Sequence, residues 1–169
     1  MFATRLAKVV MVTSLAAFAF IVTFDNVTDY ASNFDFVRHI LTMDTTFPNN
    51  ALLYRSIKQP PLWHVAYLTI IAAEGLTCLL LMIGAAALLR TLHATGVEFD
   101  EAKRYAMIGG TLAFLVWFAG FTIVGGEWFA MWQSKLWNGQ EPAFRFYMTA
   151  LAVLIFVNQS DARAEAAKT

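Results

Sequence analysis

Four long apolar runs, separated by polar segments, dominate the pattern of this chain. They cover approximately residues 9–24, 63–89, 105–124 and 142–157. A helix needs about 20 mostly apolar residues to cross a bilayer, and backbone groups in lipid must be paired within their own segment. No run shows the alternation of apolar and polar residues that is typical of a membrane strand. The pattern therefore predicts an all-α fold, a four-transmembrane-helix bundle, with residues 1–169 forming a single membrane domain.

The start of the first run has two interpretations. Arg5 and Lys8 precede it, as basic residues precede the apolar core of a signal peptide, and Ala17-Phe18-Ala19 offers a small-x-small cleavage pattern. The apolar run nevertheless continues to Phe24. This continuation favours an uncleaved membrane anchor.

Composition supports lipid as the solvent and excludes several classes of partner. Hydrophobic residues make up 59% and charged residues 14%, against about 45–50% and about 25% in ordinary globular proteins. The net charge of zero gives no electrostatic footprint for nucleic acid, and no glycine-rich phosphate loop indicates a nucleotide. The lone Cys78 excludes an intrachain disulfide.

Lysine and arginine counts predict the orientation of the spans. Seven of these residues fall on the side that holds both termini and the connector 90–104, and five fall on the side of the longer loops 25–62 and 125–141. Cytoplasmic segments carry the excess of basic residues. We therefore expect both termini in the cytoplasm, the two longer loops outside, and a disordered tail over residues 161–169.

Both outer loops are expected to contain short extracytoplasmic helices. In loop 25–62, Ser32 and Asp35 resemble a capping box, and Pro48 separates this helix from a second one near Leu52. A structural lid is favoured here over a ligand site. In loop 125–141, a helix lying flat at the membrane surface would gather the apolar side chains on one broad face, which favours anchoring over docking of another subunit. The interface candidates are Trp128, Phe129, Trp132, Leu136 and Trp137.

Glu74 is the most informative single residue, because it lies near the middle of the second run. An ionisable group at membrane depth is a functional-site hypothesis, and burial favours its neutral form. His64, Tyr67 and Glu74 recur at the three-and-four spacing of one helix face, so we take them as ligand or proton-relay candidates. A neutral acid that only ties two helices together carries equal weight.

The remaining charged residues suggest structure rather than chemistry. Arg145 lies one turn into the fourth run, at the level of Glu127 and Glu141, and an ion-pair cluster that pins the bundle is favoured over a catalytic pair. The three histidines do not fall together on the predicted topology, so we predict no metal and no cofactor, with haem and quinone as less favoured alternatives. No catalytic residues are identified, and hydrolase motifs are missing.

Two groups of outer-loop residues resemble the bacterial predicted small integral membrane proteins, a family of unknown function. The resemblance spans nearly the whole chain and implies a four-span protein of the bacterial inner membrane, without an assigned reaction, substrate or cofactor. Its first part runs over residues 29–34, 38–39 and 43–48, and its second part over residues 125–129, 131–134, 137–139 and 143–146.

Two functions remain open at this stage. We expect a non-catalytic accessory or scaffolding subunit of a larger inner-membrane complex, respiratory or photosynthetic, whose partners are membrane lipid and other integral membrane subunits. The alternative is a small transporter or a quinone- or lipid-binding protein that uses the face of the second span around Glu74.

Overall fold

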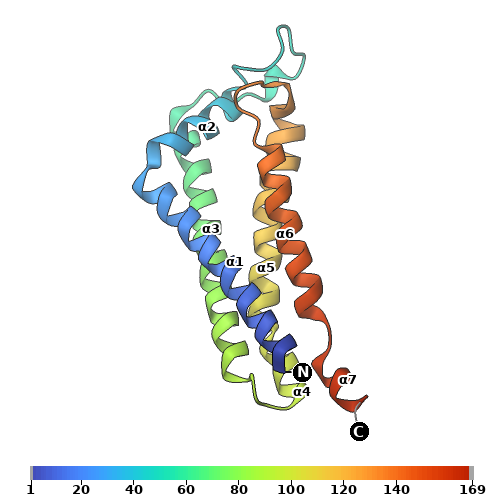
Figure 1. The fold of residues 1–169 in the computed structure, drawn as a ribbon. Helices are drawn as coiled ribbons and strands as arrows, with labels where there is room; N and C mark the ends of the chain where they lie inside the picture. The colour runs from blue at the N-terminus through green and yellow to red at the C-terminus, as the bar shows by residue number, and fades with distance from the viewer. Residues whose placement is uncertain (1, 168–169) are drawn as a thin grey trace.

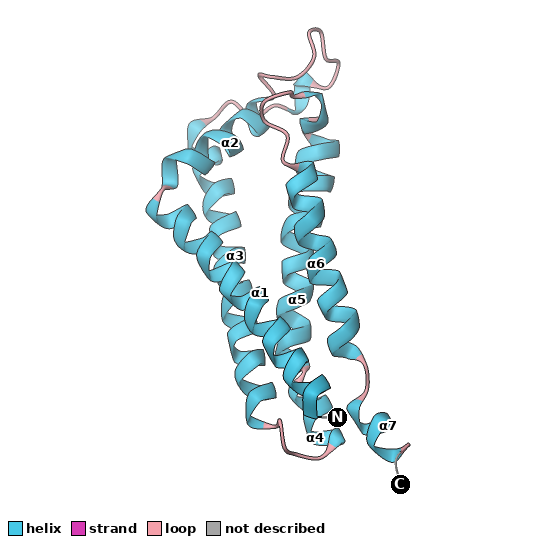
Figure 2. Cartoon of the chain, viewed as in Figure 1, coloured by secondary structure: helices cyan, strands magenta, loops and turns pink. Residues whose placement is uncertain are grey.

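The computed structural model describes residues 2–167, and every regular element in that part of the chain is helical (Figure 2). The elements are α1 (Phe2–Thr28), α2 (Tyr30–Thr42), the 3₁₀ turn η1 (Leu53–Arg55), α3 (Pro60–Arg90), α4 (Gly96–Ala102), α5 (Arg104–Trp117), the π-helix η2 (Phe118–Trp128), the 3₁₀ turn η3 (Met131–Gln133), α6 (Gln140–Asn158) and α7 (Asp161–Ala166). The predicted all-helical class is confirmed.

Four long rods lie side by side: α1, α3, α5 continued by η2, and α6 (Figure 1). Helix α3 packs against both α1 and α5, and α6 packs against α5. Both ends of the chain lie at the same end of the molecule, beside α4 and α7, and we call this the terminal end (Figure 1). The opposite end is covered by α2 and the loops over residues 43–59 and 129–139, which we call the cap.

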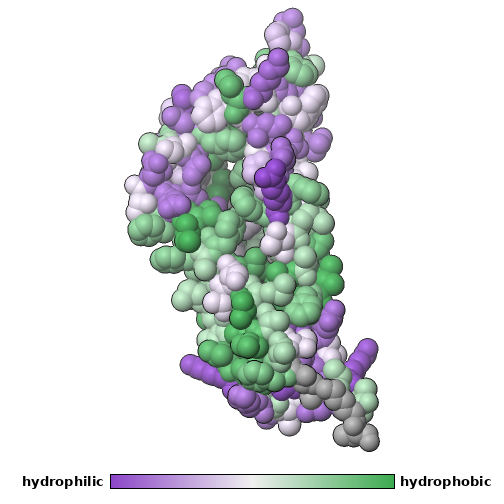
Figure 3. Space-filling view, viewed as in Figure 1, coloured by the Kyte–Doolittle hydropathy of each residue, from purple (hydrophilic) through white to green (hydrophobic). Residues whose placement is uncertain are grey.

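Three helical stretches are long and apolar enough to cross a membrane. They are Phe2–Thr28, Pro60–Arg90 and the continuous stretch Gly96–Trp128, with mean hydropathies of 2.1, 2.1 and 2.0. In the most apolar 18-residue window of each stretch, only 22–33% of the residues are buried. Most of these side chains therefore face outward, as in helices that contact lipid. On the face drawn in Figure 3, hydrophobic residues fill the middle and hydrophilic residues gather at both ends.

Helix α6 falls outside this class of three. Its first two turns carry the polar residues Gln140, Glu141 and Arg145, which lower the hydropathy of its 19 residues. The structure therefore gives three stretches of spanning length and composition and a fourth, more polar rod packed against them.

Small residues allow α3 and α5 to approach closely. A Cβ atom built on Gly84 would lie 2.7 Å from the Cα of Ala106, and one on Gly109 would lie 2.9 Å from the backbone nitrogen of Leu81. Helix backbones come this close only where one partner has no side chain. The resulting contact holds the second and third apolar stretches together over Leu81, Leu88 and Ala106.

The cap differs from the two short helices expected in loop 25–62. Helix α2 begins at Tyr30, two residues before the expected cap Ser32, whose hydroxyl instead donates to Asp29 Oδ2 (2.7 Å). Asp29 marks a bend directly after α1, so α2 continues the first rod at a changed direction. The second expected helix is only the single turn η1.

The flat helix expected over residues 125–141 is not formed. The third rod instead continues as a π-helix to Trp128, and Ala130 then adopts a left-handed conformation with φ 53° that ends the helix. Only the turn η3 is regular in the rest of this loop before α6. The helical spacing of the apolar residues in this stretch therefore did not predict its conformation, because the left-handed Ala130 interrupts the helix.

The prediction of a disordered tail is wrong for residues 161–166, which form α7. Helix α7 packs on α4, a helix that begins with a complete capping box between Thr95 and Glu98. A Cβ on Gly96 would lie 2.7 Å from the Cα of Ala162, so the two short helices touch at a glycine. The last two residues of the expected tail, 168–169, lie outside the described part of the chain.

The substitution Gly84→Ala is expected to lower the free energy of unfolding by about 1–3 kcal/mol, because its new methyl group would press against the backbone of Ala106. Thermal unfolding of the purified protein in one detergent measures this loss. Gly120→Ala is the matched control, because no atom lies within 4 Å of a Cβ at that position. Equal losses for both variants would contradict the close contact.

Candidate functional site

A polar cluster lies inside the bundle around Glu74, on the face of α3 that meets α1. Glu74 is 3% exposed, and its Oε2 accepts a hydrogen bond from Asn26 Nδ2 at 2.7 Å. Tyr67 lies seven residues earlier on α3, two helical turns away and on the same face. It is 1% exposed, and its hydroxyl donates to Asn26 Oδ1 at 3.1 Å. Helix periodicity therefore brings both predicted residues to one partner.

Asn26 is the centre of this cluster. Its Oδ1 also accepts a hydrogen bond from Asn33 Nδ2 at 2.7 Å, so both lone pairs of that oxygen are engaged. Its three partners lie on α2 and α3, and Asn26 itself lies on α1, so it joins the first two rods to the cap. Neither Asn26 nor Asn33 was predicted as a site residue. The one sequence feature that could have indicated Asn26 is a polar amide in the last turn of an apolar helix.

The second carboxyl oxygen of Glu74, Oε1, has no hydrogen-bond partner among residues 2–167. Glu74 lines a cavity of about 180 Å³ between all four rods and α2. An acid that is almost fully buried and has one free oxygen at a cavity can hydrogen-bond a molecule inside it. The cavity is lined by Val22, Asn26, Asn33, Phe36, Val37, Tyr67, Ile70, Glu74, Trp117, Phe121 and Phe146.

An apolar cavity of about 360 Å³ adjoins the Glu74 cavity on the cap side. The two share four lining residues: Phe36, Val37, Ile70 and Phe121. The π-helix η2 contributes Gly120, Phe121, Val124 and Gly125 to the wall. π-Helical turns are rare and occur often at functional sites. A ligand with a polar head and an apolar body would match this pair of cavities.

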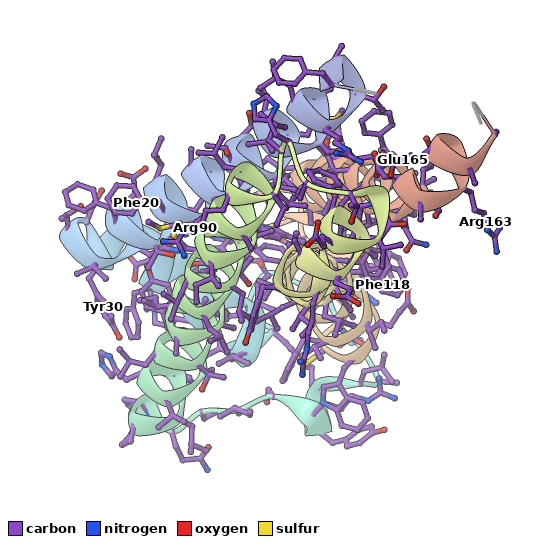
Figure 4. The ribbon with its side chains drawn as sticks, turned by 90° about the horizontal axis from the view of Figure 1, so that it is seen from below. Phe20, Tyr30, Arg90, Phe118, Arg163 and Glu165 are labelled. Atoms are coloured by element: carbon purple, nitrogen blue, oxygen red, sulfur yellow. The ribbon has the colours of Figure 1, made fainter. Side chains whose placement is uncertain are left out.

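His64 lies apart from Tyr67 and Glu74, although all three share α3. It is exposed at the cap, where its Nδ1 is 2.9 Å from the hydroxyl of Tyr30 and its ring stacks on Phe34 at 4.3 Å between centroids. In Figure 4, Tyr30 lies at the outer edge of the molecule. The structure therefore brings together Tyr67 and Glu74 but leaves His64 outside the buried cluster.

The three histidines have separate neighbours. His39 Nδ1 lies 2.9 Å from the carboxylate of Asp44, and His93 stacks on Phe2 with 5.4 Å between centroids. Within residues 2–167, no three or more His, Cys, Asp or Glu side chains lie together in a way that could hold a metal ion.

The three ion-pair candidates do not form one cluster. Arg145 Nη2 contacts Glu141 Oε1 at 2.6 Å, but both side chains are exposed and belong to the same helix. Glu127 makes no ion pair within residues 2–167; its carbonyl oxygen accepts from Arg55 Nη1 at 3.4 Å. An exposed pair one helical turn apart contributes little to stability.

The interface candidates divide into exposed and buried residues. Leu136 is 82% exposed, and Trp128 and Trp132 are about half exposed, at 53% and 50%. Phe129 is buried inside the cap. Trp137 stacks on His39 with 4.5 Å between ring centroids. The guanidinium of Arg55 covers the ring of Trp128 at 4.7 Å, so the exposed aromatic residues of the cap carry a basic group among them.

A buried ionic cluster at the terminal end was not predicted from the sequence. Asp161 at the start of α7 accepts hydrogen bonds from Lys8 (2.5 Å) and Lys103 (2.7 Å), and Arg5 lies 3.5 Å from its other oxygen. These four residues are each 5% exposed or less. The sequence did not indicate that these basic residues pair with Asp161, because the acid stands more than 50 positions from each of them.

Asp100 completes this cluster by holding the start of α7. Its carboxylate accepts hydrogen bonds from the backbone nitrogens of Asp161 (2.9 Å) and Ala162 (3.1 Å) and from the hydroxyl of Ser160 (2.8 Å). Glu165 adds a contact with the nitrogen of Gly96, while Arg163 extends away from the bundle (Figure 4). The tail is therefore attached to α4 at several points.

Burial opposes the charge of Asp161, but hydrogen bonds from Lys103 and Lys8 outweigh it and hold the pKa of Asp161 below its ordinary value. A group whose pKa is depressed in the folded state contributes stability above its unfolded pKa. That contribution is lost as the pH falls through the lower folded pKa. The attachment of the tail is thus complete at neutral pH and weakens only in strong acid.

The substitution Asp161→Asn is expected to lower the free energy of unfolding by about 3 kcal/mol, because it leaves Lys8 and Lys103 buried without their shared counter-charge. Trypsin should then cut after Arg163 faster than in the wild type, between about pH 5 and pH 8. Glu141→Gln is the control, because the Glu141 side chain is exposed; it should change neither the free energy of unfolding nor the rate of cleavage. An unchanged cleavage rate in Asp161→Asn would argue against the cluster.

Comparison with known proteins gives a family but no function. The family model described as "Predicted small integral membrane protein (DUF2165)" matches residues 4–160. No curated protein and no solved structure matches the chain. The match extends from the first helix through α6, so it includes the Glu74 cavities and the cap. The chain belongs to this family of small integral membrane proteins of unknown function.

Proposed function

We propose that this protein binds a small amphipathic molecule inside its helical bundle and does so without catalysing a reaction. The observation that carries the proposal is the free Oε1 of Glu74 at a cavity that adjoins a larger apolar one. The polar head of the ligand would meet Glu74, and its apolar part would occupy the space beside η2. Isoprenoid quinones and lipids are candidate ligands of this kind.

The geometry favours binding over a purely structural role for Glu74. A side chain that only ties α3 to α1 needs a single contact, and Asn26 already supplies it through Oε2. The other oxygen contributes nothing to that tie. It is accessible at the cavity, where a bound molecule can pair with it.

The proposal includes four spans in the bacterial inner membrane. Helix α6 has 19 residues, so its length of about 28 Å is close to the hydrocarbon thickness of about 30 Å. Exposed apolar residues such as Phe144 and Ile155 suit contact with lipid. Four spans with more basic residues at the terminal end would place both termini in the cytoplasm. A reporter enzyme that works only in the cytoplasm, fused to the C-terminus, should be active; an inactive fusion would reverse the orientation.

The exposed residues of the cap support a second candidate function. Tyr54 and Leu136 are 75% and 82% exposed, and Trp128 and Trp132 lie in the same cap. An exposed group of large apolar residues marks either a membrane surface or an interface with another protein. An accessory subunit of a larger inner-membrane complex would use this surface.

Filling the shared wall of the two cavities tests the leading proposal. Ile70 lines both cavities, so Ile70→Trp should expel a bound molecule whatever its charge. The protein is extracted from its native membrane with surrounding lipid, and mass spectrometry compares the small molecules retained by the wild type and the variant. A compound present in stoichiometric amount in the wild type should be lost.

Ile83→Trp is the matched control, because Ile83 lies on the same helix and is 41% exposed. It should retain the compound. If the wild type and both tryptophan variants carry the same small molecules, the binding proposal fails. The same preparation tests the second candidate: a protein that stays bound, and is released by Leu136→Asp but not by Lys135→Ala, would favour an accessory subunit.

A further inference from the structure

The walls of the Glu74 cavity combine one acid with several aromatic rings. Among the residues that line it, Glu74 is the one charged side chain, and no Lys, Arg or His is present. Two ring pairs form much of the wall. Trp117 and Phe146 meet edge to face with 5.7 Å between centroids, and Phe36 and Phe121 lie 6.0 Å apart. These pairs come from four different helical segments: α5, α6, α2 and η2.

Such a wall attracts positive charge. The face of an aromatic ring carries a negative potential, and rings around an alkylated ammonium stabilise it. A carboxylate among apolar groups needs a counter-charge, because a lone ionised group in a low dielectric is strongly destabilised. Within residues 2–167 no basic side chain pairs with Glu74. The ligand itself would supply the missing charge.

We propose that the molecule bound at Glu74 is an organic cation, an alkylated ammonium with apolar substituents. This inference rests on the proposed binding function and names its ligand class. The ammonium group would lie between Glu74 Oε1 and the rings of Trp117, Phe121 and Phe146, and its apolar substituents would reach the adjoining cavity.

Other ligand classes match the site less well. An inorganic cation such as calcium takes about 6–8 oxygen ligands. Two of the oxygens here already accept hydrogen bonds: Asn26 Oδ1 from Tyr67 and Asn33, and Glu74 Oε2 from Asn26. A phosphate headgroup would meet the acid with no basic residue beside it. A neutral quinone could accept a hydrogen bond from the protonated acid, but it carries no positive charge for the aromatic rings to stabilise.

Cation binding would exchange with a proton. In the empty site the neutral acid is the stable form of a carboxyl group surrounded by apolar residues. When the cation enters, the proton of Glu74 leaves to water and the carboxylate balances the ligand. Titratable groups facing the cavity are Glu74 and Tyr67 on α3. The other packed segments contribute uncharged residues: Val22 and Asn26 from α1, Asn33, Phe36 and Val37 from α2, Trp117 and Phe121 from α5 and η2, and Phe146 from α6.

Two probes of one shape test the charge of the ligand. Benzyltrimethylammonium is the cation, and neopentylbenzene is its neutral isostere, with carbon in place of the charged nitrogen. Calorimetry of the full chain in lipid nanodiscs measures the affinity for each probe and, in buffers of different ionisation enthalpy, the protons released. The cation should bind at least about tenfold more tightly than the isostere and release a proton. Its affinity should rise by up to about tenfold per pH unit while the acid is neutral.

Variants assign the effect to named side chains. Glu74→Gln keeps an oxygen that accepts from Asn26, so the fold should persist while cation affinity falls at least about tenfold and loses its pH dependence. Trp117→Leu should weaken the cation roughly tenfold and leave the isostere unchanged. Glu127→Gln removes an exposed acid at the cap and is the control with wild-type affinity.

The outcomes separate this inference from the binding function. If both probes bind equally and neither Glu74→Gln nor Trp117→Leu weakens binding, the ligand is not a cation. The proposal that an amphipathic molecule binds in the two cavities would then still stand. If neither probe binds and Ile70→Trp expels no native compound, both proposals fail. If Glu74→Gln does not fold, the proton release of the wild type and the Trp117→Leu variant still decide the question.

Discussion

Polar side chains buried among apolar helices must find their partners within the chain, because lipid offers none. This constraint shapes both ends of the molecule. Near the cap, Asn26 accepts two hydrogen bonds and donates one, which fixes α1, α2 and α3 relative to one another. At the terminal end, Asp161 plays the same part for α1, α7 and the junction of α4 with α5. Between these two clusters the contacts are almost entirely apolar, and the small residues of α3 and α5 set how closely the rods approach.

The positions of the rods could be predicted because each is an uninterrupted apolar run. The second run, predicted over 63–89, is α3 over Pro60–Arg90, and it begins three residues earlier because Pro60-Pro61 suit the first turn of a helix. The π-helical backbone after Trp117 could not be predicted, since the apolar residues of this stretch continue those of α5 and carry no sign of a different helix type. The left-handed Ala130 has no sequence sign at all, because alanine ordinarily favours a helix.

The candidate site was partly accessible from the sequence for a related reason. Tyr67 and Glu74 lie on one helix, so their common face follows from helix geometry. Asn26 lies on α1, and its contact with Glu74 depends on how α1 packs against α3; Asn33 reaches Asn26 only across the bend at Asp29. His64 shows the limit of periodicity, because it shares the face of Tyr67 but stands beyond the end of the buried region, against Tyr30 and Phe34.

The ionic cluster at the terminal end has a consequence for how the protein is made. Lys8 lies in α1, while its counter-charge Asp161 follows 153 positions later in the chain. Until α7 has been made and has docked on α4, Arg5 and Lys8 lack this acidic partner. Helix α1 therefore gains its full set of contacts at the terminal end only when α7 is in place.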